Sequence, residues 1–270
     1  LVISLPGVPY EMKSLFEDKC SKIIKQKFSL SIIHHRTIKT VGIGESWLSD
    51  LISEWEKNLD STISLAYLPS IGRVKLRLTG RGNNLNKIKS VIDKEEKKVV
   101  PIIRKYIYGF DNEELESCVG NLLIKNKKTL SIAESCSGGY LSHLVTSIPG
   151  SSKYFSGSIV AYSNNIKINN LNVNKKNIEK FGAVSKEVVE EMATNVRKKF
   201  NSSIGISTSG IAGPSGGTEK KPVGTVWIGY SDKNKTLSKK LLLTNRRDIN
   251  ITLSSIGALN MARLNLEGYS

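Results

Sequence analysis

The feature that most constrains the fold is the alternation of short β-rich segments with helical segments in the second half of the chain. Residues 129–134, 157–162 and 203–208 are apolar and β-prone, whereas residues 115–125 and 186–200 carry apolar side chains at helical spacing. This alternation is typical of layered α/β folds, in which helices pack against a sheet. The sequence therefore predicts a three-layer α/β/α domain, with a further strand pair at residues 223–230 and 237–243 and a closing helix at 249–266.

An earlier stretch has a different pattern and predicts a small domain with the element order βαββα. Its expected strands and helices cover residues 31–41, 45–59, 63–67, 74–78 and 84–106. Residues 109–114 are polar and rich in turn formers, which favours a domain boundary there. We expect domains at residues 29–110 and 111–270.

The first residues form a third region. Residues 1–5 are apolar and predict a short buried strand, which ends at Pro6 and Gly7, and residues 11–25 predict a helix. A strand needs a partner, and none precedes it. We therefore expect residues 1–28 to be the remnant of a domain whose larger part is absent.

Composition bounds the class of protein. A hydrophobic content of 39% and a charged content of 24% are typical of a folded globular chain. There is no transmembrane run, and Cys20, Cys118 and Cys136 are widely spaced without a CxxC pair, so we expect a cytoplasmic protein without a structural disulfide. The Asp, Glu, His and Cys residues show no ligand spacing, so we expect no metal and no cofactor.

The net charge of +16 raises the question of a nucleic-acid partner. Residues 1–110 carry 19 basic and 11 acidic side chains, and residues 111–270 carry 21 and 13, so each part has a balance of +8. This even spread, together with the absence of a GXXG loop at residues 42–45 and 80–82, argues against nucleic-acid binding. A nucleic-acid-binding module nevertheless remains the alternative from another functional class.

Two loops rich in glycine and serine follow expected strands, at residues 135–139 and 210–217. In open α/β sheets the carboxyl ends of strands are where ligands bind, and glycine lets backbone N–H groups approach a phosphate or an oxyanion. Each loop alone is equally consistent with a surface turn. Neither matches the phosphate loop GxxxxGK[ST] or GxGxxG, which argues against a nucleoside triphosphatase or a dinucleotide dehydrogenase.

Serine is abundant in this region, whereas histidine is nearly missing. His143 lies within a predicted helix, so a Ser-His-Asp triad is unsupported. A serine can instead be activated by a lysine whose pKa is lowered by burial. Ser151 or Ser152 with Lys167 is a candidate pair, although spacing alone leaves Lys167 equally open to being a solvated lysine.

Six stretches occur in the order seen in the CinA carboxyl-terminal family, which this chain resembles. They are AESCSGG (133–139), GSS (150–152), AYSN (161–164), GAVS (182–185), SGIAGP (209–214) and PVGTV (222–226). The opening LPGVPYEM (5–12) resembles the end of the family's molybdopterin-biosynthesis-like domain, and the βαββα unit resembles its KH-like domain. The amino-terminal domain resembles an ADP-ribose pyrophosphatase, and we expect this chain to lack that activity.

The resemblance implies that the chain is an amidohydrolase. The implied reaction hydrolyses the carboxamide of nicotinamide mononucleotide to nicotinic acid mononucleotide and ammonia, for pyridine nucleotide recycling. Ser152 would be the nucleophile and Lys167 its general base, with Tyr162 orienting or polarising one of them. Ser135 and Ser209 would line the site, although Ser135 is also open to being a helix cap and Tyr162 to being a core residue.

The resemblance also implies substrate contacts and an assembly. The implied substrate-binding residues are Ser137, Gly138, Gly139, Gly213, Gly216, Gly217 and Arg247. The variant sequence around Arg247 leaves open whether Arg246 substitutes for it. The family further implies a homo-oligomer, and a catalytically degenerate homologue is a second alternative.

Overall fold

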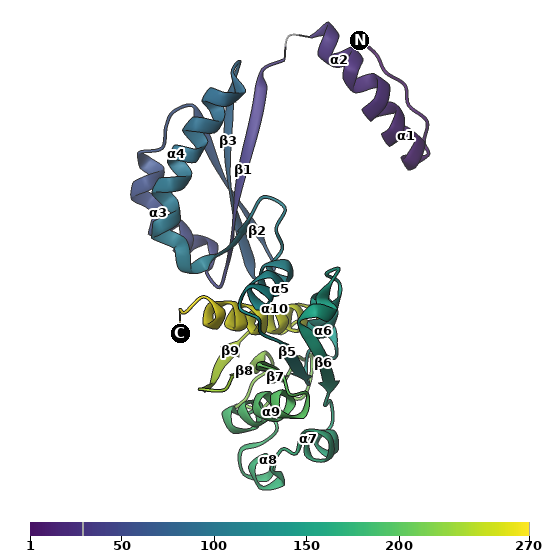
Figure 1. Cartoon of the computed structure of the whole chain (residues 1–270), viewed down its shortest axis with the longest axis vertical. Coiled ribbons are helices and arrows are strands. Elements are labelled where there is room, and N and C mark those ends of the chain that lie inside the picture. Colours follow the sequence, from purple (N-terminus) through teal and green to yellow (C-terminus); the bar gives the residue numbers. More distant parts are fainter. Residues whose placement is uncertain (29, 270) are drawn as a thin grey trace.

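The protein is described by a computed structural model of residues 1–28 and 30–269, and it contains two sheets in two units, preceded by a helical arm (Figure 1). The expected domain boundary at residue 29 lies outside the described residues. No helix among the described residues is long and apolar enough to span a membrane.

The first unit is a four-stranded antiparallel sheet with two helices on one face. Its elements are β1 (Ile32–Val41), α3 (Glu45–Lys57), β2 (Ile63–Ser70), β3 (Arg73–Gly82), α4 (Leu85–Ile103) and β4 (Ile107–Phe110), with strand order β2-β3-β1-β4. Alternate residues of the strands, such as Leu76 and Leu78, are fully buried against Ile52 of α3 and Ile92 of α4. The predicted βαββα order is correct but incomplete, because β4 is too short to show strand periodicity.

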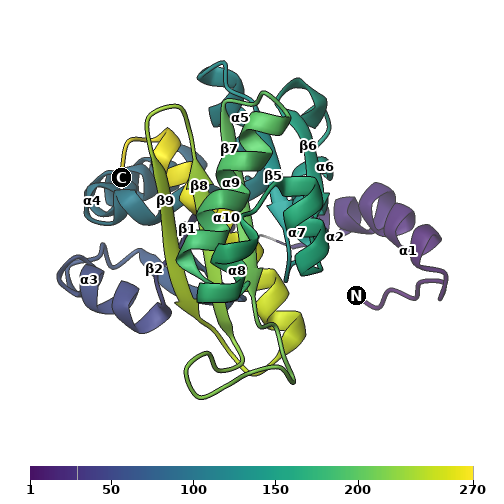
Figure 2. The same cartoon turned by 90° about the horizontal axis from the view of Figure 1, so that it is seen from below.

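The second unit has the predicted three layers. Its sheet has the order β6-β5-β7-β8-β9, in which β5 (Leu130–Glu134), β6 (Phe155–Val160) and β7 (Ile204–Gly210) are parallel, and β8 (Thr225–Ser231) and β9 (Thr236–Leu242) are antiparallel. One face is covered by α5 (Leu115–Lys125), α6 (Tyr140–Thr146) and α10 (Arg247–Leu266). Figure 2 shows α7 (Asn164–Leu171), α8 (Lys175–Phe181) and α9 (Lys186–Lys199) on the opposite face.

Glycines in the sheet let α9 lie directly on it. A Cβ atom on Gly205 of β7 would lie 2.1 Å from the Ala193 carbonyl oxygen, and one on Gly229 of β8 would lie 2.7 Å from the Val189 carbonyl oxygen. No side chain fits at either position without moving the helix. This close packing brings the segment that precedes α9 against the carboxyl end of β7.

The arm consists of α1 (Pro9–Leu15), a π-helical turn (Phe16–Cys20) and α2 (Ser21–Lys27), and it extends away from the start of β1 (Figure 1). Residues 1–5 form no strand, so that prediction is wrong. A strand requires a hydrogen-bonding partner strand, and no strand in the described part of the chain pairs with residues 1–5.

Buried charges join the two units. Arg263 of α10 is fully buried and donates hydrogen bonds to the carbonyl oxygens of Ile107 at 2.9 Å and Lys105 at 2.7 Å. Arg73 of β3 also pairs with Glu116 of α5 at 2.8 Å. These bonds fix the first unit onto the helical layer formed by α5 and α10.

Candidate active site

The site lies at the carboxyl ends of the parallel strands, where Ser135 directly follows β5. Its loop turns through Gly138 and Gly139, both of which have positive φ, and then enters α6. The Ser135 amide donates to the carbonyl oxygen of Thr208 on β7 at 2.9 Å. The serine is therefore held between two neighbouring strands, and its residue is 8% exposed.

Lys167 reaches this serine from α7, whose amino terminus is capped by Ser163. The Lys167 amine donates to Ser135 Oγ at 2.9 Å and to the carbonyl oxygen of Ala161 at 2.8 Å. Lys167 is 2% exposed, and no carboxylate pairs with it among the described residues. Burial in the absence of a counter-ion lowers the pKa of Lys167 to about 8.

The expected pair of Ser152 with Lys167 is not formed. Ser152 is exposed in a 3-10 turn (Ser151–Lys153) that precedes β6, whereas Lys167 lies in the helix that follows β6. The two residues are therefore at opposite ends of one strand, and β5 runs parallel to it, so Ser135 lies at the end where Lys167 lies. Strand direction was already implied by the sequence pattern and would have favoured Ser135.

Glu134 is a site residue that the sequence reasoning missed. Its carboxylate is fully buried, and Oε2 accepts from Ser137 Oγ at 2.7 Å and from the amides of Gly139 at 2.9 Å and Leu141 at 3.1 Å. Oε1 accepts from the amide and hydroxyl of Ser142. Five donors around one carboxylate fix the loop that carries the adjacent serine.

Ser137 offers the site its backbone amide, whereas its side chain is already occupied. Its hydroxyl is buried between Glu134 Oε2 and Thr208 Oγ1, each at 2.7 Å, and so cannot contact a substrate directly. The amides of Cys136 and Ser137 donate no hydrogen bond within the described residues. Two free N–H groups next to Ser135 are suited to an oxyanion.

The Ser209 side chain hydrogen-bonds to the backbone of another segment. It is 1% exposed, and its hydroxyl donates to the carbonyl oxygen of Ala183 at 2.7 Å. This bond fastens the segment before α9 to β7. The proton of the Ser209 hydroxyl is thus committed to a buried backbone carbonyl, and the predicted substrate-lining role of this serine stays a prediction.

Arg247 is an exposed cation beside Tyr162, the residue that follows Ala161. Arg247, at the start of α10, donates to the Tyr162 hydroxyl at 2.7 Å and to the carbonyl oxygen of Gly213 at 3.0 Å. Tyr162 is 59% exposed and is therefore no core residue. Arg246 instead pairs with Asp248 at 2.7 Å on the surface. The structure thus joins Arg247, and not Arg246, to the loop that carries Gly213.

The other glycines predicted to bind substrate differ in their exposure to solvent. Gly138, Gly216 and Gly217 are exposed, and Gly139 is half-buried beside Glu134. Within the described residues, no three His, Cys, Asp or Glu side chains gather as a metal ion would require. The polar groups that converge here are therefore a serine, a lysine, backbone amides and an arginine.

The fold and this site define an α/β protein with a buried lysine–serine pair at the carboxyl ends of its parallel strands. The family model described as the CinA C-terminal domain matches residues 112–266, and that of the damage-inducible protein CinA KH domain matches residues 35–109. The chain belongs to the CinA family.

Individual relatives agree with this assignment. A CinA-like protein of Cytophaga hutchinsonii is 52% identical over 98% of this chain and 63% of its own length, and one of Flavobacterium psychrophilum is 45% identical over 96% and 62%. The chain thus spans less than two thirds of these relatives. The crystal structure of competence damage-inducible protein A from Klebsiella pneumoniae matches 58% of this chain and 97% of its own, with 28% identity and a TM-score of 0.56.

Proposed function

We propose that this chain hydrolyses the carboxamide of nicotinamide mononucleotide, with Ser135 as the nucleophile and Lys167 as its general base. The observation that carries the reaction type is the buried amine of Lys167, 2.9 Å from Ser135 Oγ, with a pKa lowered to about 8. A neutral amine accepts the hydroxyl proton, which an ordinary ammonium does not. The identity of the substrate rests on the resemblance to the CinA carboxyl-terminal family.

The first half of the reaction forms an ester. Ser135 Oγ attacks the carboxamide carbon while its proton passes to Lys167 Nζ, and the carbonyl oxygen becomes an oxyanion facing the free amides of Cys136 and Ser137. The Lys167 ammonium then gives its proton to the leaving nitrogen. The C–N bond breaks, ammonia departs, and the acyl group stays on Ser135.

The second half releases the acid. Water gives a proton to the neutral Lys167 amine and attacks the ester carbon, and the ammonium returns that proton to Ser135 Oγ as the C–O bond breaks. The products are nicotinic acid mononucleotide and the restored pair. The carbonyl oxygen of Ala161, 2.8 Å from the amine, keeps Nζ in place through both halves.

A nucleotide also suits the cationic border of the site. Arg247 has a planar fork that matches phosphate oxygens, and it is exposed beside Tyr162 and Gly213. Tyr162 directly follows Ala161, whose carbonyl holds Lys167. Tyr162 thus connects the backbone that holds Lys167 with Arg247, which supports a substrate with an amide at one end and a phosphate at the other.

The test compares two serine variants. Ammonia release from nicotinamide mononucleotide is measured for the parent chain, Ser135→Ala and Ser152→Ala, after circular dichroism has verified each fold. We expect Ser135→Ala to lose at least about 1,000-fold in kcat, and Ser152→Ala to stay near the parent. The opposite ranking would refute Ser135 as nucleophile, and no ammonia from the parent chain would refute the substrate assignment.

A further inference from the structure

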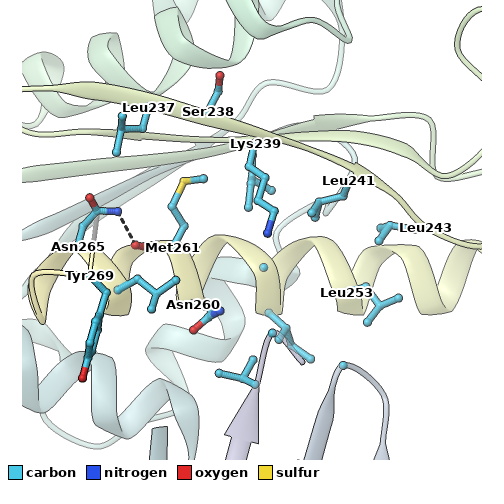
Figure 3. A pocket seen from close by; sticks show the side chains of 17 residues that line it. Leu237, Ser238, Lys239, Leu241, Leu243, Leu253, Asn260, Met261, Asn265 and Tyr269 are labelled. Carbon is cyan, nitrogen blue, oxygen red and sulfur yellow. Dashed lines mark hydrogen bonds between the residues drawn. The ribbon is translucent and has the colours of Figure 1, made fainter. Parts of the chain in front are cut away.

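A cavity of about 480 Å³ lies between β9, α10 and the turns of the first unit, away from the site described above. Leu237 and Leu241 of β9 form one wall, and Leu253 and Met261 of α10 form another (Figure 3). Leu264 of α10 also lines the cavity. The turns that carry Gly42 and Gly72 close the third side. The lining is mainly apolar, and it draws on both units.

The shape of this cavity suits a small molecule. Its lining follows α10 from Leu253 to Leu264, about 16 Å at the helical rise. Tyr269 lies toward one end, and Leu243 and Leu253 lie at the other (Figure 3). Pockets of this volume bind drug-sized ligands, whereas a helix about 10 Å wide needs an open groove. A compact ligand therefore fits better than a peptide helix.

Five polar side chains interrupt the apolar lining, those of Ser238, Lys239, Asn260, Asn265 and Tyr269. Ser238 donates to Glu190 and Asn265 to the carbonyl oxygen of Met261, whereas Lys239 and Asn260 each carry a donor that faces no such partner. Side chains of a strand alternate between faces, so Lys239 lies between Leu237 and Leu241 on the side of α10, and its side chain extends toward that helix (Figure 3). Asn260 accepts from Arg263 Nε at 3.0 Å through its oxygen, which leaves its NH2 group as a donor. That group lies beside Gly42, 2.8 Å from where a Cβ would be.

Neither donor has an acceptor within the part of the chain that the structure describes. Lys239 forms no ion pair there, and the Asn260 NH2 group makes no hydrogen bond. A cation and a neutral donor in an apolar cavity are complementary to a carboxylate that carries an apolar body. An uncharged hydrocarbon would leave both donors unused.

We propose that this cavity binds a medium-chain monocarboxylate, with its carboxylate on Lys239 and Asn260 and its alkyl chain along α10. The alkyl chain displaces water from the leucine-lined walls, and the carboxylate stays near the mouth, where Lys239 is exposed. The ligand contacts both units at once. The site is independent of the proposed amidase activity, because it lies beyond α10 rather than at the ends of the parallel strands.

The test is calorimetric titration of the full chain with hexanoate, octanoate and decanoate, and with decanol as the uncharged analogue. Each added pair of methylenes should tighten binding about fifteenfold while the cavity has room. Lys239→Gln should weaken decanoate about fivefold and leave decanol unchanged. Lys240→Gln is the matched control, since it removes the same charge from the neighbouring residue, whose side chain faces the other side of β9.

Three results would overturn the proposal. Binding that does not depend on chain length would exclude the apolar cavity, and equal weakening by the two lysine variants would exclude a specific carboxylate contact. If no carboxylate binds and sedimentation shows self-association that Leu241→Asp abolishes, a second copy of the chain covers this face instead.

Discussion

The pH dependence of the reaction tests the lysine base directly. Only the neutral amine of Lys167 accepts the Ser135 proton, and its pKa is lowered to about 8 from the ordinary 10.5 because burial disfavours the charged form. With that pKa, about 1% of the amine is neutral at pH 6 and about half at pH 8. We therefore expect kcat/KM to rise about 50-fold between these two values and to level off above pH 9.

The assay is initial-rate ammonia release at substrate concentrations well below KM, in buffers of constant ionic strength. An unperturbed lysine would instead keep the profile rising to about pH 10. A profile that is flat from pH 6 to 9, or that continues to rise past pH 10, would refute the assignment of Lys167 as a base with a lowered pKa.

Stability gives an independent check on the same residue. Between pH 8 and 10.5 the unfolded chain binds the Lys167 proton and the folded chain does not, so stability contributed at this residue rises with pH through that window. Below pH 8 the folded protein carries the cost of a buried charge, about 3 kcal/mol. Lys167→Met should thus abolish activity yet raise the free energy of unfolding at pH 7, measured in urea; a less stable variant would contradict this.

Three further variants probe the surroundings of the site. Glu134→Gln places an NH2 group among five donors, so it should lower kcat at least about 100-fold and destabilise the fold by about 3 kcal/mol. The inflection of the kcat/KM profile near pH 8 should stay where it is, and a shifted inflection would show that Glu134 acts on Lys167 itself. Arg247→Ala should raise the KM for the mononucleotide about tenfold but leave the KM for the riboside unchanged, because the riboside lacks the phosphate. Arg246→Ala serves as the control, and equal effects on both substrates would contradict a phosphate contact. Arg263→Met should cost about 3 kcal/mol in urea unfolding, because it removes the buried bonds to Lys105 and Ile107, and an unchanged midpoint would contradict their role in joining the units.

The layered fold was predictable because the sheet strands are short, apolar and separated by helices with regular periodicity. The residues between β6 and α9 were not assigned, since α7 and α8 are rich in Asn and Lys and have little apolar periodicity. These two helices are held in place by a few buried side chains, such as those of Leu171 and Ile178, and by side-chain caps from Ser163 and Asn174. Local pattern is a weak guide where so few residues pack.

The site was predictable in its loops but not in its pairing. Ser135, Lys167 and Arg247 were all candidates, and the structure brings Lys167 to Ser135 rather than to Ser152. Which serine the lysine reaches depends on strand direction, which the alternation of strands and helices implies, and on the position of α7, which no motif in this chain specifies. Glu134 was missed because a carboxylate within an apolar strand gives no sign of the five donors that fold around it.

The orientation of the Glu134 side chain explains how the pKa of Lys167 stays low although a carboxylate directly precedes Ser135 in the sequence. If Glu134 faced Lys167, an ion pair would stabilise the ammonium and raise the pKa of the base. Instead both carboxylate oxygens are turned toward α6, where Ser137, Ser142 and the amides of Gly139 and Leu141 hold them. The same bonds that fix the nucleophile loop therefore keep the counter-ion away, and Lys167 is left to bond only neutral oxygens.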